Sequence, residues 1–327
     1  MPDVDAEILA ELANNKLVTS TQVGIQTLAG GVSCDVWKIE GVDRPLVVKK
    51  PLEKLRVEAD WRASIARGDA EIAWLKRVHG MDARLVPEIV AVLPESGAFV
   101  MRYVPDGKVW KDELMARRTD HEFAAEVGRA LVRIHSETAG NRADMKTFAT
   151  QENFRQLRTE PFLLHLQASH PDLADLLARL AERLLDSRIA LMHGDISPKN
   201  ILVTANGPVF LDAECAAYGD PAFDLAFCQT HLLLKTVFLE DDAPLDSARN
   251  LAAAYRAGND WEDGDALDRR AGELTSALLV ARIDGKSPAP YLVDAGQREH
   301  VRSTARRLLH DGFSLGEILE TWGGNYR

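Results

Sequence analysis

Short apolar runs separated by turn residues dominate the first hundred residues of the chain. Apolar positions there alternate with polar ones in five segments, and between about residues 60 and 78 they recur instead at helical spacing. Gly30-Gly31, residues 41–45 and residues 94–97 supply turns between the segments. The pattern predicts five antiparallel strands and one main helix, preceded by a short helical opening at residues 5–14. The expected strands are residues 18–28, 32–39, 46–49, 89–93 and 99–104.

After Pro105 the pattern changes to long amphipathic stretches with a period near 3.6 residues. Short extended pieces interrupt them only around residues 189–211. The expected helices are residues 122–134, 153–167, 172–185, 245–255, 266–283 and 295–309. The sequence therefore predicts an α+β protein with a small lobe, residues 1–104, built on a five-stranded antiparallel sheet, and a larger, mostly helical lobe, residues 105–327.

Length and composition agree with two folded lobes. The chain has 327 residues, of which 46% are hydrophobic and 27% charged, values that exclude a disordered or coiled-coil protein. A net charge of −11 argues against a nucleic acid or an anionic membrane as the main partner. No apolar stretch looks long enough to span a bilayer, so no membrane partner is expected either. We expect a monomer or a homodimer.

The three cysteines, Cys34, Cys215 and Cys228, lie far apart without paired spacing. Such spacing supports neither a disulfide framework nor a thiolate zinc site. The sequence therefore favours a cytoplasmic location.

Polar side chains at fixed offsets occupy the segment from His193 to Glu214. Asp195 and Asn200 lie five residues apart on one tight loop, and Asp212 follows a short strand twelve residues later. These groups can converge on one point, which phosphoryl transfer requires, because a metal ion neutralises the phosphates while a carboxylate orients the attacking hydroxyl. A polar loop whose Asp and Asn cap backbone groups is the alternative for this motif taken alone.

Three features of the small lobe favour the chemical interpretation. Lys49 ends a strand, where it can reach nucleotide phosphates, and Glu71 on the following helix can hold it. The turn from Gly30 and Gly31 to Ser33 offers backbone amides that can cover phosphates. The connector that contains Met101, Arg102 and Val104 can present backbone groups to an adenine edge. Each feature alone is weak, because edge lysines and glycine turns are common.

The order of these parts resembles the aminoglycoside phosphotransferase and 5-methylthioribose kinase family, whose members have a two-lobed protein-kinase-like fold. The family's H-G-D-x-x-x-x-N loop is matched by residues 193–200, its D-x-E by residues 212–214 and its G-D-P-x-x-D-L-A by residues 219–226. The resemblance implies an ATP- and Mg²⁺-dependent phosphotransferase that acts on a small-molecule hydroxyl.

The same resemblance implies a role for each matching residue. Asp195 would be the catalytic carboxylate, and Asn200, Asp212 and Glu214 would hold the metal. Structural support would come from His193, Asp220 and Asp224. The residues expected at the nucleotide are Gly30, Gly31, Ser33, Lys49, Glu71, Met101, Arg102 and Val104.

The acceptor is the least determined part of the prediction. A sugar or sugar-like alcohol is our first expectation, and an aminoglycoside is the alternative, with the acidic stretch of residues 240–265 as a candidate amine site. Trp261, Arg282 and Lys286 are the candidate acceptor residues. A catalytically silent nucleotide-binding regulatory protein is the alternative from another class.

Overall fold

Two compact units make up the chain, Met1–Gly107 and Lys108–Arg327. The computed structural model describes residues 5–18, 23–28, 32–56 and 61–323. The expected phosphate-covering residues Gly30 and Gly31 lie outside the described residues, whereas Ser33 lies within them.

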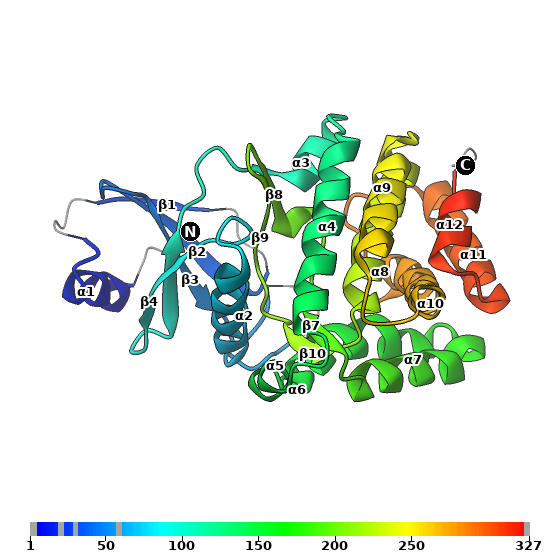
Figure 1. The fold of residues 1–327 in the computed structure, drawn as a ribbon, viewed down its shortest axis with the longest axis horizontal. Helices are drawn as coiled ribbons and strands as arrows, with labels where there is room; N and C mark the ends of the chain where they lie inside the picture. The colour runs from blue at the N-terminus through cyan, green and yellow to red at the C-terminus, as the bar shows by residue number, and fades with distance from the viewer. Residues whose placement is uncertain (1–4, 19–22, 29–31, 57–60, 324–327) are drawn as a thin grey trace. The chain divides into compact units, whose positions relative to one another are not determined.

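The first unit contains a five-stranded antiparallel sheet in the order β1-β2-β3-β5-β4 (Figure 1). Its strands are β1 (Gly24–Thr27), β2 (Cys34–Glu40), β3 (Leu46–Pro51), β4 (Ile89–Leu93) and β5 (Ala98–Arg102). The sheet confirms the five predicted strands. Because β4 and β5 form a hairpin, β5 is the strand that returns beside β3.

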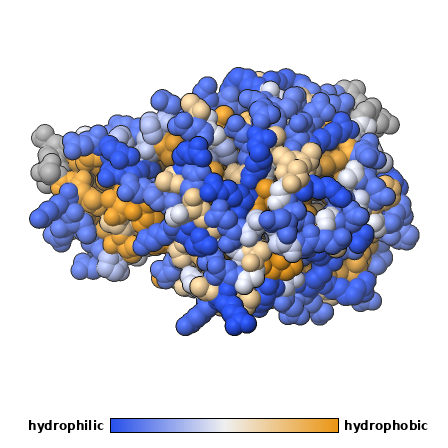
Figure 2. Space-filling view, viewed as in Figure 1, coloured by the Kyte–Doolittle hydropathy of each residue, from blue (hydrophilic) through white to orange (hydrophobic). Residues whose placement is uncertain are grey.

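The two faces of this sheet carry different side chains. Trp37 and Val48 are opposite each other in the register and belong to a buried cluster with residues of α1 (Ala6–Asn14). Val36, opposite Lys49, shares the other face, and α2 (Arg67–Met81) packs against β3 and β4. The alternation along β3 therefore points Lys49 away from the α1 core. Figure 2 shows apolar residues gathered on the visible face of this unit.

Helices make up most of the second unit, as predicted (Figure 1). They are α3 (Trp110–Met115), α4 (His121–Thr138), α5 (Arg142–Thr147), α6 (Gln151–Phe154), α7 (Ala174–Asp186), α8 (Ala222–Leu239), α9 (Ala243–Gly258), α10 (Gly264–Asp284), α11 (Ala295–Asp311) and α12 (Leu315–Thr321). Two small sheets lie among them, β10-β7 and β6-β8-β9. Their strands are β6 (Lys108–Val109), β7 (Ala190–Met192), β8 (Ile201–Thr204), β9 (Gly207–Phe210) and β10 (Ala217–Gly219).

Helix α8 was missed by the pattern of polar and apolar positions. Nearly all of its residues are buried, and it packs against α9 and α10. A helix that is covered on every side is apolar all round and shows no amphipathic period. Its length and hydropathy would also suit a membrane span, but 89% of that window is buried inside the protein. In the fold α8 is the central helix of the second unit.

The single helix expected at residues 153–167 is wrong. The structure has α6, then a π-helix at Arg155–Leu163 and a 3₁₀-helix at Leu164–Ala168. Pro161 lies within the π-helix. Proline has no N–H to donate and its ring clashes with the preceding turn, so a regular α-helix does not continue through it. The irregular turn positions Arg158, which has a role in the site described next.

Candidate active site

The loop after β7 is held by the carboxylate of Asp224, at the start of α8. Its two oxygens accept the backbone N–H groups of His193 and Gly194, both at 2.7 Å. The side chain is fully buried, and His135 Nε2 lies 3.3 Å from Oδ2. Two charge-assisted hydrogen bonds from successive amides fix the backbone just before Asp195.

Gly194 is required at its position for two reasons. Its φ is +77°, a left-handed conformation that other residues adopt at a cost. A Cβ atom built there would also lie 2.4 Å from the carbonyl oxygen of Cys215. The loop can therefore pass close to residue 215 only because position 194 has no side chain.

Asp195 is buried and its carboxylate meets three donors. Oδ1 lies 2.8 Å from a terminal guanidinium nitrogen of Arg158, and Oδ2 accepts from Asn200 Nδ2 at 2.7 Å. Lys199 Nζ is 3.2 Å from Oδ2. These contacts set the direction in which the carboxylate can receive a further hydrogen bond.

Arg158 is a site residue that sequence reasoning missed. It is 7% exposed, and its Nε donates to the carbonyl of Gly194 at 2.6 Å. Burial lowers the pKa of Arg158, but the charges of Asp195, Glu214 and Asp212 raise it by more. The net shift of the pKa is therefore upward. The sequence held one signal for it: Arg158 stands among apolar residues such as Leu157 and Phe162. An arginine that is buried with such neighbours needs a counter-ion, which indicates a carboxylate nearby.

His193 connects the loop that carries Asp195 to the strand that precedes Asp212. Its Nε2 donates to the carbonyl of Leu211 at 3.0 Å, and its Nδ1 accepts from the backbone N–H of Asp195 at 3.1 Å. Burial lowers the pKa of His193 in spite of the nearby carboxylates. The ring therefore acts as a neutral bridge with one donor and one acceptor.

The three expected metal-binding residues present oxygen donors. Asn200 directs its amide nitrogen to Asp195, which leaves the carbonyl oxygen as its donor to a metal. Asp212 has a φ of +67°, a conformation that a non-glycine residue adopts when the surroundings impose it. Glu214 is buried, and its charge and that of Asp212 both act on Arg158.

This donor set fits Mg²⁺ that is shared with phosphate. Among the described residues there is no group of three or more His, Cys, Asp or Glu side chains placed to hold a metal alone. Mg²⁺ usually binds one or two carboxylates and completes its shell with water and substrate phosphates. The oxygens of Asn200 and Asp212 suit a hard cation such as Mg²⁺ better than they suit zinc.

Asp220 belongs to the support of the loop. Its carboxylate accepts two hydrogen bonds from Arg270, at 2.9 and 3.1 Å, and one from the N–H of Ala222 at 3.0 Å. Arg270 in turn binds Glu262 at 2.7 Å. The start of α8, which carries Asp224, is anchored in this way to α10.

In the first unit, Lys49 and Glu71 form a buried ion pair. Lys49 Nζ lies 2.7 Å from both carboxylate oxygens of Glu71, and the two residues are 4% and 1% exposed. Met101 and Val47 are opposite each other in the register beside them. The neighbouring Lys50 pairs instead with Asp5 at the partly exposed edge of α1.

Arg67 orders the segment around Ser33. It is fully buried and donates to the carbonyls of Ser33 at 2.7 Å and of Leu52 at 2.5 Å. Arg102 ends β5, where its N–H donates to the carbonyl of Glu88 at 2.9 Å. Val104 follows and is half-buried.

The candidate acceptor residues fall into two places. Trp261 packs edge-on against His135 and Tyr255, behind the Asp224 carboxylate, with ring centroids 6.3 and 6.2 Å away. Arg282 is 8% exposed, and burial lowers its pKa while the charge of Asp195 acts in the opposite direction. Lys286 donates its backbone N–H to Pro161 in the π-helix. A direct contact of any of the three with an acceptor stays a prediction.

Arginines partner several carboxylates of the acidic stretch at residues 240–265. The ion pairs are Asp241–Arg117, Asp246–Arg249, Glu262–Arg270 and Asp265–Arg256. Three of these pairs, those of Asp241, Asp246 and Asp265, are substantially exposed, so each holds its carboxylate only weakly.

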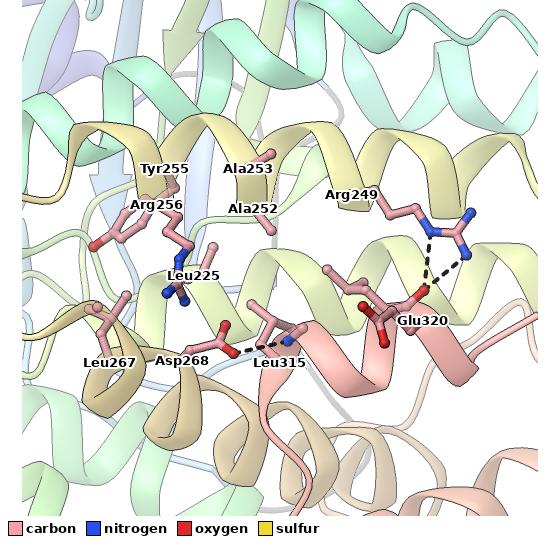
Figure 3. A pocket seen from close by; sticks show the side chains of 13 residues that line it. Leu225, Arg249, Ala252, Ala253, Tyr255, Arg256, Leu267, Asp268, Leu315 and Glu320 are labelled. Atoms are coloured by element: carbon pink, nitrogen blue, oxygen red, sulfur yellow. Dashed lines mark hydrogen bonds between the residues drawn. The ribbon is translucent and has the colours of Figure 1, made fainter.

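A pocket in the second unit is lined by none of the predicted catalytic, metal-binding or nucleotide-binding residues. Its walls come from α8, α9, α10 and α12, with Leu225, Tyr255 and Leu315 among the lining side chains (Figure 3). Asp268 and Arg249 in its wall bond to backbone groups of Gly316 and Leu319. None of the residues that surround Asp195 contributes to this pocket.

Comparison with known proteins gives a consistent picture. Residues 24–272 match the model of the family described as phosphotransferase enzyme family, APH. Methylthioribose kinase of Pectobacterium carotovorum is 27% identical over 310 residues, which are 84% of this chain and 74% of that enzyme. For methylthioribose kinase of Escherichia coli O45:K1 the identity is 24%, covering 61% of this chain and 54% of that enzyme. The chain thus spans little more than half of the length of the latter.

Among solved structures, a choline kinase from Cryptosporidium parvum has the same fold. It superposes with a TM-score of 0.61 at 12% identity, covering 97% of this chain and all of the other. At that identity the likeness concerns the fold alone.

Proposed function

Since the chain belongs to the phosphotransferase enzyme family, we propose that it is an ATP- and Mg²⁺-dependent kinase that phosphorylates a hydroxyl group of a small molecule. The observation that carries the proposal is the arrangement around Asp195, whose buried carboxylate is oriented by Arg158 and Asn200 at the end of a braced loop. Phosphoryl transfer depends mainly on positioning and charge stabilisation, and this loop supplies both.

In the proposed reaction, the acceptor hydroxyl donates a hydrogen bond to Asp195 and its oxygen attacks the γ-phosphorus of ATP. The bond between that phosphorus and the β,γ-bridging oxygen breaks, ADP leaves, and the hydroxyl proton passes to the Asp195 carboxylate. Transfer is direct, with no phosphorylated enzyme. Arg158 and Lys199 hold cationic groups beside the carboxylate and offset its charge as the anionic phosphoryl group approaches.

The metal and nucleotide roles are assigned residue by residue. Asn200, Asp212 and Glu214 would hold Mg²⁺, which neutralises charge on the phosphates when bound. Lys49, oriented by Glu71, would contact the α- and β-phosphates, and the backbone near Ser33 would lie over them. The backbone of Arg102 and Val104 would take the adenine edge, with Met101 beside the ring.

A sugar or sugar-like alcohol is the proposed acceptor class. Support comes from the methylthioribose kinases among the relatives, since those enzymes are named for a sugar acceptor. The cysteines are all free, so we also propose that the enzyme works in the cytoplasm.

The test is a coupled assay of ADP release over sugars, sugar alcohols, amino alcohols and aminoglycosides. We expect at least one sugar-like alcohol to give release well above the acceptor-free rate. ATP binding without release on any acceptor would instead favour the silent regulatory protein. Release only on amine-bearing antibiotics would favour the aminoglycoside enzyme.

Replacing Lys49 by Met is expected to raise the KM for ATP by about ten- to hundredfold. A hydrogen bond between charged groups is worth about 1.5–3 kcal/mol, and the variant loses that contact to the phosphates. The measurement is the initial rate against ATP concentration. Lys50→Met is the matched control, because this neighbour lies on the same strand and pairs with Asp5. Equal KM values in the two variants would contradict the assignment of Lys49.

A further inference from the structure

Three cationic side chains of the second unit are buried, Arg158 and Arg282 near Asp195 and Lys235 near Arg282. Arg158 comes from the π-helix, Lys235 from α8 and Arg282 from α10, and they are 7%, 1% and 8% exposed. Burying a charge is costly unless an opposite charge or several hydrogen bonds compensate for it. Each of the three therefore calls for a partner.

Among the described residues, Arg158 alone of the three has a carboxylate partner, Asp195. In the part of the chain that the structure describes, Lys235 Nζ donates only to the carbonyl of His231, at 3.1 Å. Arg282 donates to the carbonyl of Ser287 and, at 3.1 Å, to its hydroxyl, and its Nε has no hydrogen-bond partner. The buried hydroxyl of Tyr291 has none either. Two cations and a phenol thus retain unused donors.

Electrostatic interactions of Arg282 with Lys235 and with Tyr291 join these groups into one cluster, and aromatic rings lie beside its cations. The guanidinium carbons of Arg158 and Arg282 lie 5.7 and 5.9 Å from the ring centre of Phe162. Lys235 Nζ lies 5.4 Å from the ring centre of Tyr291. Burial lowers the pKa of His231 far below its usual value, and the charges of all three cations lower it further. His231 is therefore neutral and adds no charge.

We propose that Arg282, Lys235 and the Tyr291 hydroxyl bind a carboxylate or phosphate group of the acceptor, so that the phosphorylated hydroxyl belongs to an anionic small molecule. The inference rests on the proposed function for the identity of Asp195 as the catalytic carboxylate. An oxyacid group supplies both the missing counter-charge and several acceptor oxygens. The ion pair between Arg158 and Asp195 places the anion subsite next to the loop where the hydroxyl would react.

Lys235 makes binding depend on pH. Burial is the main cause that lowers the pKa of Lys235 to about 7, and the charges of Arg282 on α10 and Lys111 on α3 contribute, while Cys228 on its own helix acts in the opposite direction. A bound anion favours the charged ammonium, so it raises this pKa. Affinity for the anion is therefore highest below about pH 7 and falls as the pH rises above it.

The experiment measures anion binding without ATP or turnover. Inorganic phosphate and malonate are titrated into the full chain at constant ionic strength with chloride as the balancing ion, followed by calorimetry and by the midpoint of thermal unfolding. We expect both to bind at about pH 6 and to bind at least about tenfold more weakly at about pH 9. Tighter phosphate binding points to a phosphorylated acceptor, and tighter malonate binding to a hydroxy acid.

Variants assign the binding to the cluster. Lys235→Met and Arg282→Gln are each expected to weaken phosphate and malonate binding by about tenfold or more, because each removes a charged hydrogen-bond donor. Both remove an uncompensated buried cation, so the proteins should fold. Lys146→Met, at an exposed lysine of α5, is the control and should bind as the unchanged protein does. Lys49→Met, in the first unit, reports any anion that binds instead at the proposed site of the nucleotide phosphates.

Three results overturn the inference. The first is that the unchanged protein binds no anion. The second is that Lys235→Met and Arg282→Gln bind anions as tightly as the unchanged protein, and the third is that Lys49→Met alone loses binding. If any of these occurs while phosphoryl transfer still depends on Asp195, only the anionic acceptor is withdrawn. If the cluster binds anions but no acceptor is phosphorylated, the proposed function fails and the anion site stands.

Discussion

Replacing Asp195 by Asn is expected to lower kcat for the true acceptor by about 10²- to 10⁴-fold, the usual contribution of a positioned general base. The amide has nearly the same shape as the carboxylate but cannot take the hydroxyl proton. It also carries no charge to pair with Arg158, which lies 2.8 Å from Oδ1. The measurement is ADP release at saturating ATP and acceptor, with ATP affinity measured separately to show that the nucleotide still binds.

The matched control for this prediction is Asp175→Asn, at an exposed aspartate of α7. It makes the same chemical change in the same unit, away from the loop, and should leave kcat unchanged. A kcat for Asp195→Asn within about twofold of the control would remove Asp195 from the mechanism, because lost proton transfer alone predicts a far larger drop.

Asp224→Asn is expected to have the second largest effect, a loss of about 3–5 kcal/mol in the free energy of unfolding. Each carboxylate oxygen accepts one backbone N–H, from His193 and from Gly194. An asparagine side chain has one oxygen, so its NH₂ group must face the second backbone N–H. Two hydrogen-bond donors then oppose each other in a buried place, and neither has an acceptor. Urea unfolding measures the stability loss. At a temperature where the variant stays folded, kcat should fall too, since the loop that carries Asp195 loses its anchor.

Asp263→Asn separates this effect from the loss of a charge. Asp263 caps α10 and accepts the N–H of Ala266 with one oxygen, at 2.7 Å. Asparagine caps helices about as well as aspartate, so this variant should change stability by less than about 0.5 kcal/mol. Similar losses in the two variants would contradict the bracing role of Asp224.

Much of the fold could be predicted from the sequence because the first unit follows local rules. Each strand there is bounded by turn residues, and one face of the sheet is covered by α1 while α2 packs on the other side, so alternation survives along the strands. Lys49 illustrates the point, since its place at a strand end and the spacing to Glu71 suggested the ion pair that the structure contains. In the second unit the longer helices with one solvent-exposed face, α4, α7, α9, α10 and α11, were predicted in the same way, whereas the short helices α3, α5 and α12 were not.

Helix α8 and the π-helix could not be predicted from the local pattern of polar and apolar positions. Periodicity reports the difference between a covered and an open face, and α8 has no open face. Within the π-helix, the sequence spacing of Arg158 looked like that of an ordinary amphipathic helix, but Pro161 prevents one. The direction in which Arg158 points depends on that irregular turn, and no pattern of polar and apolar residues encodes it.

By itself the sequence determined which groups are candidates for the chemistry, because Asp195, Asn200 and Asp212 lie on one short segment with spacing that can bring them together. Only the tertiary structure decided what surrounds them. Arg158 pairs with Asp195, whereas Lys235 and Arg282 are buried without carboxylate partners among the described residues. These side chains come from helices that are far apart in the chain. The charge around a site is set by such long-range packing, which is why the overall charge of −11 coexists with a cationic cluster beside the proposed catalytic carboxylate.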